Sequence, residues 1–371
     1  MDITNLNIAI VGAGYAGAAA AKALSNLGAN VTVYEQASQV REVGAGIGLR
    51  PSSMNQFNQW GIGDAIKAVT SPSNAFEILT AECHRIAVEE WPEKEAYGET
   101  TNFIHRGDFI EALLSVLPEG MVKLGHKLES LVEGDDGVTL TFTNGETATA
   151  DLVVGADGIN SVVRNKLFST AAPVFAGEHA YRVVIDADQT FDMVADGNLR
   201  MYIGRGTKVY LLPLLHRNQV SFDITALSAD STWAPQVTLA DVLKTVEGFD
   251  ERIVKITEGL DMAQVNVRAV YDIDPVENWN TDAVVLIGDA AHAMCHHQGQ
   301  GANSAILDAG ALADALAAGP TVAEGLAAYK AARKPITDEL QRISRHGWTD
   351  DELDDVFPGQ KPGQIAATIE A

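Results

Sequence analysis

Residues 7–35, with the sequence NIAIVGAGYAGAAAAKALSNLGANVTVYE, decide the fold of this chain. The stretch begins with a short apolar strand, passes through closely spaced glycines into helix-forming alanines, and ends with a second strand pattern. Two strands that are joined by a helix lie parallel, because the crossover returns the chain to the same end of the sheet. The sequence therefore predicts a parallel sheet that is covered by helices.

The glycines Gly12, Gly14 and Gly17 form the pattern G-x-G-x-x-G at the start of the expected helix. Such glycines allow a tight turn and let the helix N-terminus approach a pyrophosphate. Glu35 closes the second strand, where an acid bonds a ribose hydroxyl and disfavours an additional 2′-phosphate. A glycine turn without a ligand is the alternative. The residues expected to contact a dinucleotide here are Gly12, Gly14, Tyr15, Ala16, Gly17, Glu35 and Gln36.

Composition excludes several classes of protein. The chain has 371 residues and a formal net charge of −24, so nucleic acids and anionic membranes, which bind clustered Lys and Arg, are not expected partners. Its apolar runs fall short of the roughly 20 residues that cross a bilayer. Residues 1–5 are polar and lead directly into the first strand, so no signal peptide is expected. With only two cysteines, Cys83 and Cys295, the chain is expected to be cytoplasmic.

Two further regions extend this picture. Residues 283–287 form a second apolar strand, followed by a Gly-Asp turn and an alanine-rich helix over 303–316. Between the two strand–helix regions, residues 175–185, 199–215 and 219–224 alternate or favour β-branched and aromatic residues, with turn signals between them. The pattern predicts an antiparallel sheet inserted into a discontinuous nucleotide-binding part.

Three more motifs carry a family resemblance. They are IHRGDF at 104–109, LVVGADGINSVVR at 152–164 and GDAAHAM at 288–294. In their order and spacing, from Ile8 to Pro335, the chain resembles the single-component FAD-dependent aromatic hydroxylases, the family of the 4-hydroxybenzoate, salicylate and 6-hydroxynicotinate hydroxylases.

The resemblance implies that each motif contacts FAD. Asp157 lies at the flavin side, Asp289 bonds the ribityl chain, and Arg106 reaches the phosphate or ribose. The helix that opens after Gly299 directs its free N–H groups and its dipole toward the negative charge of the reduced flavin. His292 is expected to be a packed histidine rather than a proton carrier. The remaining implied cofactor contacts are Arg41, Gly46, Ile47, Gly288, Gly299, Gln300, Gly301, Ala302 and Asn303.

The resemblance also implies the architecture, which is an α/β fold with a discontinuous Rossmann-like FAD-binding domain and an inserted antiparallel β-sheet domain for the substrate. NADH or NADPH is the implied co-substrate, and the choice between them stays open, as does assembly into a homodimer. We expect residues 1–72, 100–170 and 280–330 in the FAD-binding domain, residues 73–99 and 171–279 in the substrate domain, and residues 331–371 in a C-terminal helix and tail.

The activity implied by the resemblance is hydroxylation of a small phenolic or N-heteroaromatic ring. NAD(P)H reduces FAD, and the reduced flavin takes up O2 and delivers OH to the ring from a C4a-hydroperoxide. A flavoprotein reductase or oxidase of the same fold, an NAD-dependent dehydrogenase and a non-catalytic flavin-binding module are the alternatives. Bound FAD, and a ring compound that accelerates NAD(P)H oxidation with formation of a hydroxylated product, would separate them.

One position departs from the family pattern. Where family members commonly carry proline near the flavin, this chain has His296, followed by His297. Histidine titrates near neutral pH, so both are candidates to exchange a proton in the substrate pocket, although a structural histidine fits equally well. Cys295, His296 and His297 are not expected to bind a metal ion, even with Cys83 and His84 added, because adjacent residues rarely converge on one ion.

Candidate substrate contacts are Arg50, Lys208 and Tyr210. Lys208 and Tyr210 stand two positions apart on an expected strand and therefore share a face, while Arg50 follows the glycine-rich stretch at 44–48. The hypothesis is that Lys208 or Arg50 binds a substrate carboxylate, which makes the substrate an aromatic acid such as a hydroxybenzoate or hydroxynicotinate. A lysine that points outward from the sheet is equally consistent with the pattern.

Overall fold

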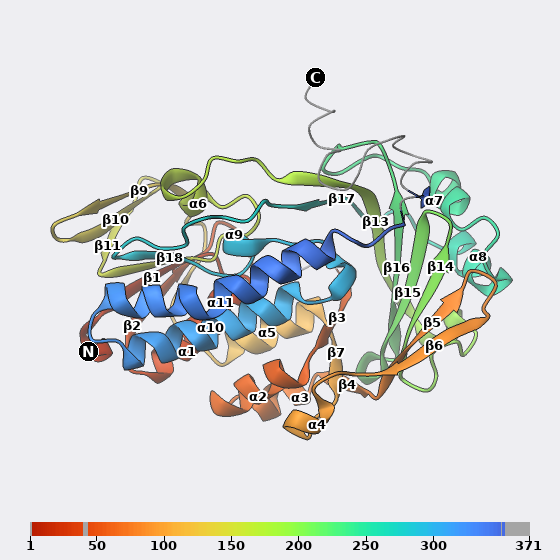
Figure 1. Ribbon diagram of the computed structural model, residues 1–371, viewed down its shortest axis with the longest axis horizontal. Helices are drawn as coiled ribbons and strands as arrows, with labels where there is room; N and C mark the ends of the chain where they lie inside the picture. The colour runs from red at the N-terminus through yellow and green to blue at the C-terminus, as the bar shows by residue number, and fades with distance from the viewer. Residues whose placement is uncertain (1, 40–43, 350, 353–371) are drawn as a thin grey trace.

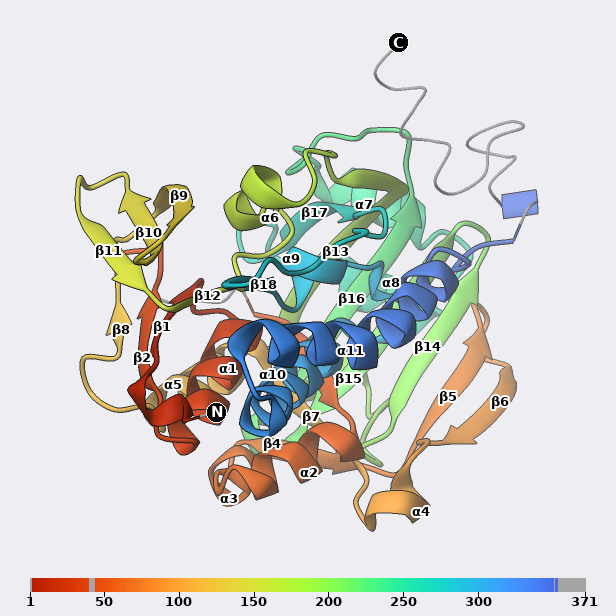
Figure 2. The ribbon, with the colours of Figure 1, turned by 60° about the vertical axis from the view of Figure 1, so that its left-hand side comes forward.

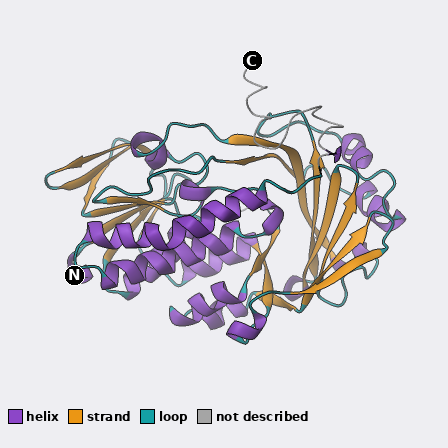
Figure 3. Ribbon diagram, in the orientation of Figure 1, coloured by secondary structure: helices purple, strands orange, loops and turns teal. Residues whose placement is uncertain are grey.

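The computed structural model describes residues 2–39, 44–349 and 351–352. Two parts lie side by side along the long axis (Figure 1), one built on a parallel sheet and the other on a large, mostly antiparallel sheet. Figure 3 shows that the long helices belong to the first part and the longest strands to the second. This arrangement confirms the predicted α/β fold with an inserted antiparallel sheet.

Five parallel strands form the sheet of the first part, in the order β18-β12-β1-β2-β8. In the centre of the sheet, Ile8 of β1 lies opposite Leu152 on one side and Val31 on the other. The strands are nearly continuous apolar runs because both faces of such a sheet are covered. Their bounds are β1 (Asn7–Val11), β2 (Asn30–Tyr34), β8 (Val122–Lys123), β12 (Leu152–Gly155) and β18 (Val284–Leu286).

Alanine-rich helices pack closely against this sheet. α1 follows β1 directly and packs along α10, and the buried alanines from Ala18 to Ala21 allow the two backbones to approach each other. Among the described residues, no helix is long and apolar enough to cross a membrane. The helices of this part are α1 (Tyr15–Asn26), α5 (Arg106–Ser115), α6 (Val162–Leu167), α9 (Asp289–His292), α10 (Gly301–Ala318) and α11 (Val322–Ser344).

The second part is a seven-stranded sheet in the order β17-β13-β16-β15-β14-β5-β6. Neighbouring strands are antiparallel except for β14 and β5. The predicted strands at 175–185 and 219–224 correspond to β13 and β16, and the stretch 199–215 divides into β14 and β15. The strands are β5 (Ala75–Thr80), β6 (Arg85–Glu90), β13 (Val174–Asp186), β14 (Leu199–Gly204), β15 (Thr207–Leu214), β16 (Gln219–Leu227) and β17 (Asn266–Asp272).

One face of the large sheet is apolar and covered. Tyr181, Val209 and Phe222 on this face form a buried cluster with residues of α7 (Leu239–Thr245) and α8 (Glu251–Glu258). Successive side chains of a strand point to opposite faces, so the residues between these apolar positions lie on the other face. That second face carries the polar residues that matter for the site.

The strand β3 connects the two parts. The N–H of Gly46 in β3 donates a hydrogen bond to Ser221 Oγ of β16 at 2.8 Å. A Cβ at Gly46 would lie 2.5 Å from Leu212 Cδ2 of β15, so the glycine lets β3 approach the large sheet closely. The face of the large sheet that carries Ser221 is therefore directed toward the first part. β3 (Gly46–Leu49), β4 (Thr70–Ser73) and β7 (Thr101–His105) form a small antiparallel sheet.

The remaining elements lie at the edges. Figures 1 and 2 both place the hairpin sheet of β9, β10 and β11 at the end of the molecule away from the large sheet. The bounds are β9 (Leu128–Gly134), β10 (Gly137–Phe142), β11 (Thr147–Ala150), α2 (Pro51–Gln59), α3 (Gly63–Lys67), α4 (Lys94–Tyr97), and the 3-10 helices η1 (Ile3–Asn5), η2 (Ala187–Thr190), η3 (Leu215–Arg217) and η4 (His296–Gln298).

Candidate active site

The G-x-G-x-x-G loop connects β1 to α1, and its glycines have different roles. Gly12 has a φ of +99°, and a Cβ there would overlap the carbonyl oxygen of Ala156. A Cβ at Gly17 would overlap the carbonyl oxygen of Gly12, so both glycines are required by packing. At Gly14 no atom lies within 4 Å of the Cβ position. The backbone is therefore open to a phosphate there, at the N-terminus of α1.

The Glu35 carboxylate holds this loop from the end of β2. It accepts hydrogen bonds from the backbone N–H groups of Ala13 and Ala37, both at 2.8 Å. A carboxylate accepts several hydrogen bonds, so Glu35 retains capacity for a ribose hydroxyl. Gln36 beside it is exposed, and the predicted contact Arg41 lies outside the described residues.

Arg106 begins α5 and lies against the first turn of α1. Its Nε donates to the Tyr15 hydroxyl at 3.0 Å, and its guanidinium lies 5.7 Å from the centre of the Tyr15 ring. Its backbone N–H donates to the carbonyl oxygen of Ala45 at 2.9 Å. This bond joins α5 to the start of β3, so the predicted contacts Gly46 and Ile47 lie next to Arg106 and Tyr15.

Asp157 lies in the loop between β12 and α6, and its carboxylate caps that helix. It accepts hydrogen bonds from the N–H groups of Val162 at 2.6 Å and Val163 at 3.2 Å. The Ser161 hydroxyl donates to it as well. Burial raises the pKa of Asp157, and these hydrogen bonds oppose that rise. The carboxylate thus fixes its own loop, in which the adjacent Ala156 packs on the glycine loop.

Arg164 joins the second and third motifs. Ser161 Oγ accepts the N–H of Arg164 at 2.9 Å, which caps α6. The guanidinium of Arg164 donates to the carbonyl oxygen of Ala290 at 3.0 Å and to that of Ile159. Because Ala290 belongs to α9, this side chain holds α9 against the loop of Asp157.

A buried carboxylate that the motifs did not reveal fixes the turn before α9. Asp308 of α10 accepts hydrogen bonds from the N–H of Gly288 at 2.9 Å, His292 Nε2 at 2.6 Å and Arg333 Nε at 2.7 Å. Burial raises the pKa of Asp308, but His292 and Arg333 outweigh it and hold the pKa at about 2. His292 is fully buried in this network, which confirms the expectation of a packed histidine.

Asp289 and the first turn of α10 are close together. Asp289 is exposed, and within the described part of the chain its carboxylate makes no hydrogen bond or ion pair. A Cβ at Gly301 would lie 4.0 Å from Asp289 Oδ1. The N–H groups of Gly301 and Ala302 belong to the first turn, where helix N–H groups have no intrahelical acceptor. An acid beside a helix N-terminus suits a ligand with hydroxyl groups and a negative region.

The side chain of Asn303, in the same turn, is fully used by the protein. Its Oδ1 accepts the N–H of Arg50 at 2.8 Å and the hydroxyl of Ser53 at 2.7 Å. Its Nδ2 donates to the carbonyl oxygens of Gly48 at 2.9 Å and Gly299 at 3.1 Å. Asn303 therefore positions β3 and α2 against α10. Only the backbone of Asn303 is available for the predicted contact with a cofactor.

These groups fit the donor set that FAD requires. Gly14 leaves space for a phosphate, Arg106 supplies a cation, and Asp289 supplies an acceptor for hydroxyl groups. The first turn of α10 supplies N–H groups for a negative region of the flavin. The main support for this fit is Gly14. Packing requires the other two glycines of the motif, but it does not require a glycine at position 14, so the space there is available to a ligand.

The large sheet contributes a row of polar residues on the face that β3 approaches. Arg182 of β13 lies directly opposite Asp223 of β16, and Asp223 lies directly opposite Tyr210 of β15. Directly opposed residues of neighbouring strands point to the same face. Asp223 stands two positions from Ser221, which bonds Gly46, so this row faces the first part of the molecule.

The charged groups of this row are not bonded to one another. Among the residues described, the Arg182 guanidinium and the Tyr210 hydroxyl make no hydrogen bond or ion pair. Burial lowers the pKa of Arg182, and nearby Asp223 opposes this. Burial raises the pKa of Asp223 to about 6, although Arg182, Ser221 and Arg106 act to lower it. Unpaired ionisable groups with shifted pKa values are typical of binding and catalytic sites.

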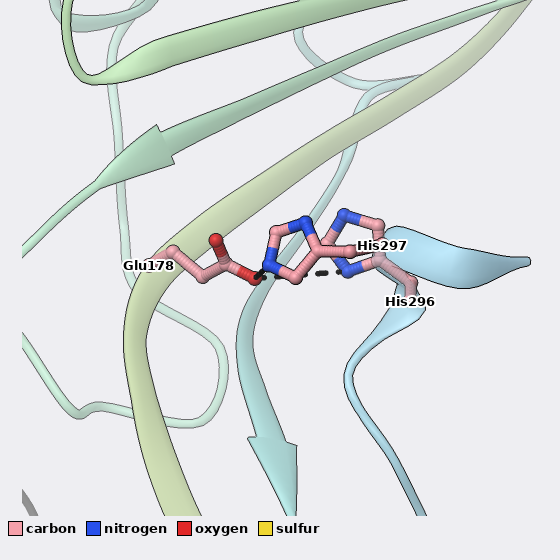
Figure 4. A group of neighbouring side chains, drawn as sticks. All are labelled: Glu178, His296 and His297. Atoms are coloured by element: carbon pink, nitrogen blue, oxygen red, sulfur yellow. Dashed lines mark ion pairs between the residues drawn. The ribbon is translucent and has the colours of Figure 1, made fainter. Parts of the chain in front are cut away.

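His296 and His297 of η4 face the same sheet (Figure 4). His297 Nε2 lies 3.0 Å from Glu178 Oε1 of β13, and His296 Nδ1 lies 3.8 Å from the same oxygen. His296 Nε2 lies 2.8 Å from Thr225 Oγ1, and the ring centres of His296 and Tyr210 are 6.5 Å apart. The two adjacent histidines therefore converge on one buried carboxylate, contrary to the expectation from their spacing.

Burial and the positive groups His297, Arg182 and Lys208 hold the pKa of His296 well below its usual value. Both of its ring nitrogens lie beside protein oxygens, those of Thr225 and Glu178. This geometry favours a neutral ring that fastens η4 to the sheet.

The same three side chains bring one possible metal-ligand atom each within 4.8 Å of one another. Ion pairing between histidines and a carboxylate also produces such distances without an ion. The cysteines do not take part: Cys295 Sγ lies 3.8 Å from Asp272 Oδ2, and Cys83 contacts Arg252 of α8, beyond the opposite face. The expectation that no metal ion binds here stays a prediction.

Lys208 shares a face with Tyr210, as predicted, but its ammonium is already engaged. Nζ donates to the carbonyl oxygen of Gly347 and lies 4.3 Å from the centre of the Trp348 ring. The Arg50 guanidinium lies 4.8 Å from the centre of the Trp91 ring, and its buried Nη1 has no hydrogen-bond partner among the described residues. Of the three predicted substrate contacts, the structure brings only Tyr210 into the polar row.

Sequence reasoning missed Arg182, Asp223 and Glu178. A weak signal was present, because Glu178 and Arg182 stand four positions apart in a long strand and so share a face. Asp223 likewise interrupts an otherwise apolar strand. Charged residues on strands otherwise rich in apolar residues were the features that could have pointed to this face.

The sequence matches the model of the family described as "FAD binding domain" over residues 5–344. It is 33% identical over 348 residues to 3-amino-4-hydroxybenzoate 2-monooxygenase PtmB3 of Streptomyces platensis, covering 91% of this chain and 86% of that protein. It is 30% identical over 321 residues to 6-hydroxynicotinate 3-monooxygenase of Bordetella bronchiseptica, covering 82% and 81% of the two chains.

Solved structures give a consistent result. A substrate complex of salicylate hydroxylase superposes with a TM-score of 0.79 at 26% identity, covering 98% of this chain and 93% of that one. Klebsiella pneumoniae HpxO in complex with FAD and uric acid superposes with a TM-score of 0.85 at 23% identity, covering 98% and 91%. At that identity, the second likeness concerns the fold alone.

Proposed function

This chain belongs to the FAD-dependent monooxygenases that hydroxylate aromatic rings, with NAD(P)H as co-substrate, and from this premise we propose that its substrate is a small phenolic or N-heteroaromatic acid. The names of the relatives support this class, since 3-amino-4-hydroxybenzoate and 6-hydroxynicotinate each combine a ring hydroxyl with a carboxylate. We place the substrate between β3, η4 and the polar face of the large sheet.

The observation that carries this proposal is the unpaired guanidinium of Arg182. It lies in a row with Asp223 and Tyr210 on the face that β3 approaches, without a hydrogen bond or ion pair from the described residues. A planar guanidinium pairs with a carboxylate through two parallel hydrogen bonds. Arg182 replaces Lys208 as our preferred partner of the substrate carboxylate, because Lys208 is bonded to Gly347 and stacked on Trp348. It is preferred to Arg50 because Arg50 is stacked on Trp91 and lies outside the polar row.

When bound, FAD supplies the redox chemistry with NAD(P)H and O2. The chain positions the cofactor and the ring and limits access of water. Gly14, Arg106, Asp289 and the first turn of α10 form the proposed cofactor cradle, together with the glycines of the N-terminal loop. Leu212 lies in contact range of β3 beside the polar row and closes the site with an apolar surface.

The proton-exchange role expected of His296 and His297 stays a prediction. Their ring nitrogens lie beside Glu178 and Thr225, which supports a positioning role for both residues. His296 remains close to Tyr210, so it still borders the proposed substrate position.

We further propose a cytoplasmic location and a homodimer. Cys83 and Cys295 are both unpaired, which agrees with a reducing compartment. Static light scattering of the purified protein tests the dimer. A monomer at working concentration would contradict it.

The first experiment is to purify the protein with its flavin and record NADH and NADPH oxidation with 3-amino-4-hydroxybenzoate, 6-hydroxynicotinate and salicylate. We expect a flavin spectrum, faster NAD(P)H oxidation with one of these acids, and a product that carries one added oxygen atom by mass spectrometry. Peroxide without an oxygenated product would favour the reductase or oxidase alternative. Acceleration only by neutral phenols would contradict the proposed acid.

A further inference from the structure

We infer that Asp223 is the general base that accepts the proton of the substrate's ring hydroxyl. The inference rests on the proposed function, because it requires a hydroxyl-bearing ring on the polar face of the large sheet. Removing this proton leaves negative charge on the ring oxygen and makes the ring more electron-rich, which favours transfer of an electrophilic oxygen to it.

The position of Asp223 is the first argument. It stands in the middle of the row, between Arg182 on one neighbouring strand and Tyr210 on the other. The Ser221 hydroxyl donates to Asp223 Oδ1 at 3.0 Å, and no further hydrogen bond to this carboxylate comes from the described residues. The side chain is only partly buried, so Oδ2 is left as an acceptor for a substrate hydroxyl.

A short hydrogen-bond chain also connects Asp223 to the cofactor side. Gly46 N–H donates to Ser221 Oγ at 2.8 Å, and the Ser221 hydroxyl in turn donates to Asp223. Gly46 begins β3 and is one of the implied cofactor contacts. The carboxylate is therefore held at a fixed place relative to that segment, which suits a group that acts on a ring positioned beside the flavin.

The electrostatic surroundings support the assignment. Burial raises the pKa of Asp223 to about 6, while Arg182 of β13, Ser221 of β16 and Arg106 of α5 oppose this rise. The carboxylate is thus ionised near neutral pH but more basic than an exposed aspartate, as an efficient general base should be. The other titratable groups around it are Tyr210 of β15, Lys208 two positions away along β15, and His296 of η4.

The other groups of the site are less suited to take this proton. Burial raises the pKa of Tyr210, so its hydroxyl stays protonated and serves as a hydrogen-bond donor. His296 Nε2 is bonded to Thr225 Oγ1, and burial and nearby positive groups hold the pKa of this ring well below its usual value. Lys208 donates to the carbonyl oxygen of Gly347.

The transfer of the proton from the ring hydroxyl to Asp223 needs no co-reactant. Asp223 Oδ2 forms a bond to the hydroxyl proton, the ring O–H bond breaks, and its electron pair stays on the ring oxygen. The cations Arg182 and Arg106 lie near enough to lower the pKa of Asp223 and so favour negative charge at this place. Asp223 passes the proton to water when the product leaves.

The test uses the FAD-loaded enzyme and whichever of 3-amino-4-hydroxybenzoate, 6-hydroxynicotinate or salicylate it hydroxylates. We expect kcat/KM of the natural sequence to fall below about pH 6, where Asp223 becomes protonated. Asp223→Asn should lower kcat by about 100-fold or more. It should also abolish the fall of kcat/KM at low pH, which is the acid limb of the pH profile. Its ultraviolet difference spectrum should lack the ionised form of the bound ring. Asp188→Asn, at an exposed carboxylate of η2, is the matched control and should behave like the natural sequence.

A second variant keeps the inference testable if Asp223→Asn folds poorly. Ser221→Ala removes the hydrogen bond that lowers the pKa of Asp223, so its acid limb should move to higher pH. An unmoved limb would overturn the inference. So would Asp223→Asn enzyme with a higher KM but an unchanged kcat and pH profile, because a mere counter-ion of Arg182 behaves in this way. Absence of any oxygenated product from the natural sequence would instead contradict the proposed function.

Discussion

Two carboxylates in different regions of the molecule have opposite surroundings. On the cofactor side, Asp308 is bonded to His292, Arg333 and the N–H of Gly288, and its pKa is about 2. On the face of the large sheet, Asp223 receives one hydrogen bond from Ser221, and its pKa rises to about 6. The first carboxylate stabilises the fold as an anion, whereas ionisation of the second costs stability.

The difference indicates that hydrogen bonds to Asp308 stabilise the cofactor side, whereas the surroundings of Asp223 suit the binding of a ligand on the large sheet. The turn that presents Asp289 is supported by Asp308, which accepts hydrogen bonds from Gly288, His292 and Arg333. In the polar row of the large sheet, Arg182 and Asp223 are not bonded to each other, which agrees with the proposed binding of a charged substrate there. The following variants test this contrast.

The largest expected effect is on stability, in Asp308→Ala. Removing this carboxylate leaves His292 and Arg333 buried without their partner, which should lower the free energy of unfolding by about 3–5 kcal/mol. Urea unfolding at neutral pH measures the loss, and flavin release should accompany it. Asp314→Ala, at an exposed position of the same helix, should change stability by less than about 0.5 kcal/mol.

The contribution of Asp308 to stability should depend on pH. The pKa of Asp308 in the folded protein is lowered to about 2. Its ionised carboxylate therefore adds to the free energy of unfolding at pH values above the unfolded pKa of about 4. The contribution is lost as the pH falls from about 4 to about 2. The stability difference between the natural sequence and Asp308→Ala should therefore shrink over that range, and a constant difference would contradict this account.

The next effect concerns binding, in Arg182→Met. Loss of a charge-assisted pair with the substrate carboxylate costs about 1.5–3 kcal/mol, which corresponds to a rise in KM of about 10- to 100-fold. Steady-state kinetics with the hydroxylated acid measures it. Arg200→Met is the control, because Arg200 is bonded to Asp196 and Glu77 and should leave KM unchanged. Equal KM values for both variants would remove Arg182 from the substrate site.

A gain in stability is expected from Asp223→Asn. The pKa of Asp223 in the folded protein is raised. Its favourable contribution to the free energy of unfolding is therefore present below the unfolded pKa of about 4, and it is lost as the pH rises through about 6. The variant should be more stable than the natural sequence by about 1–3 kcal/mol at pH 8, and the gain should disappear near pH 4. Denaturant unfolding at the two pH values checks this, and a loss of stability at pH 8 would contradict the contrast with Asp308.

The smallest effect is expected from Lys208→Met. Its ammonium is bonded to the carbonyl oxygen of Gly347 and stacked on Trp348, so it is not free for a substrate. KM for the aromatic acid should change by less than about threefold, which is below 1 kcal/mol. A rise comparable to that of Arg182→Met would restore the original hypothesis for Lys208.

Much of the cofactor side was predictable because it is local in sequence. Gly12, Gly14 and Gly17 lie within one strand–turn–helix segment, and the structure shows why two of them must be glycine. Asp157 and Asp289 likewise follow strands of the parallel sheet. The interpretation of Asn303 was less complete, since three of the four bonds of its side chain involve residues about 250 positions away.

The proposed substrate face was not predictable in this way. Arg182, Tyr210 and Asp223 form a row only because three strands pair in one register. A slip of a single residue would turn any of these side chains to the apolar face. Lys208 shows the same limit, because its partners Gly347 and Trp348 are distant in sequence.

The sequence by itself therefore determined the α/β fold, the glycine loop and the family, because each depends on contiguous motifs with strong backbone preferences. Only the tertiary structure decided which charged residues lie on the polar face of the large sheet, and it led us to propose Arg182 and Asp223 as substrate contacts in place of Lys208 and Arg50. The physical reason is that pairing and burial of a charge depend on long-range contacts, which no local pattern specifies.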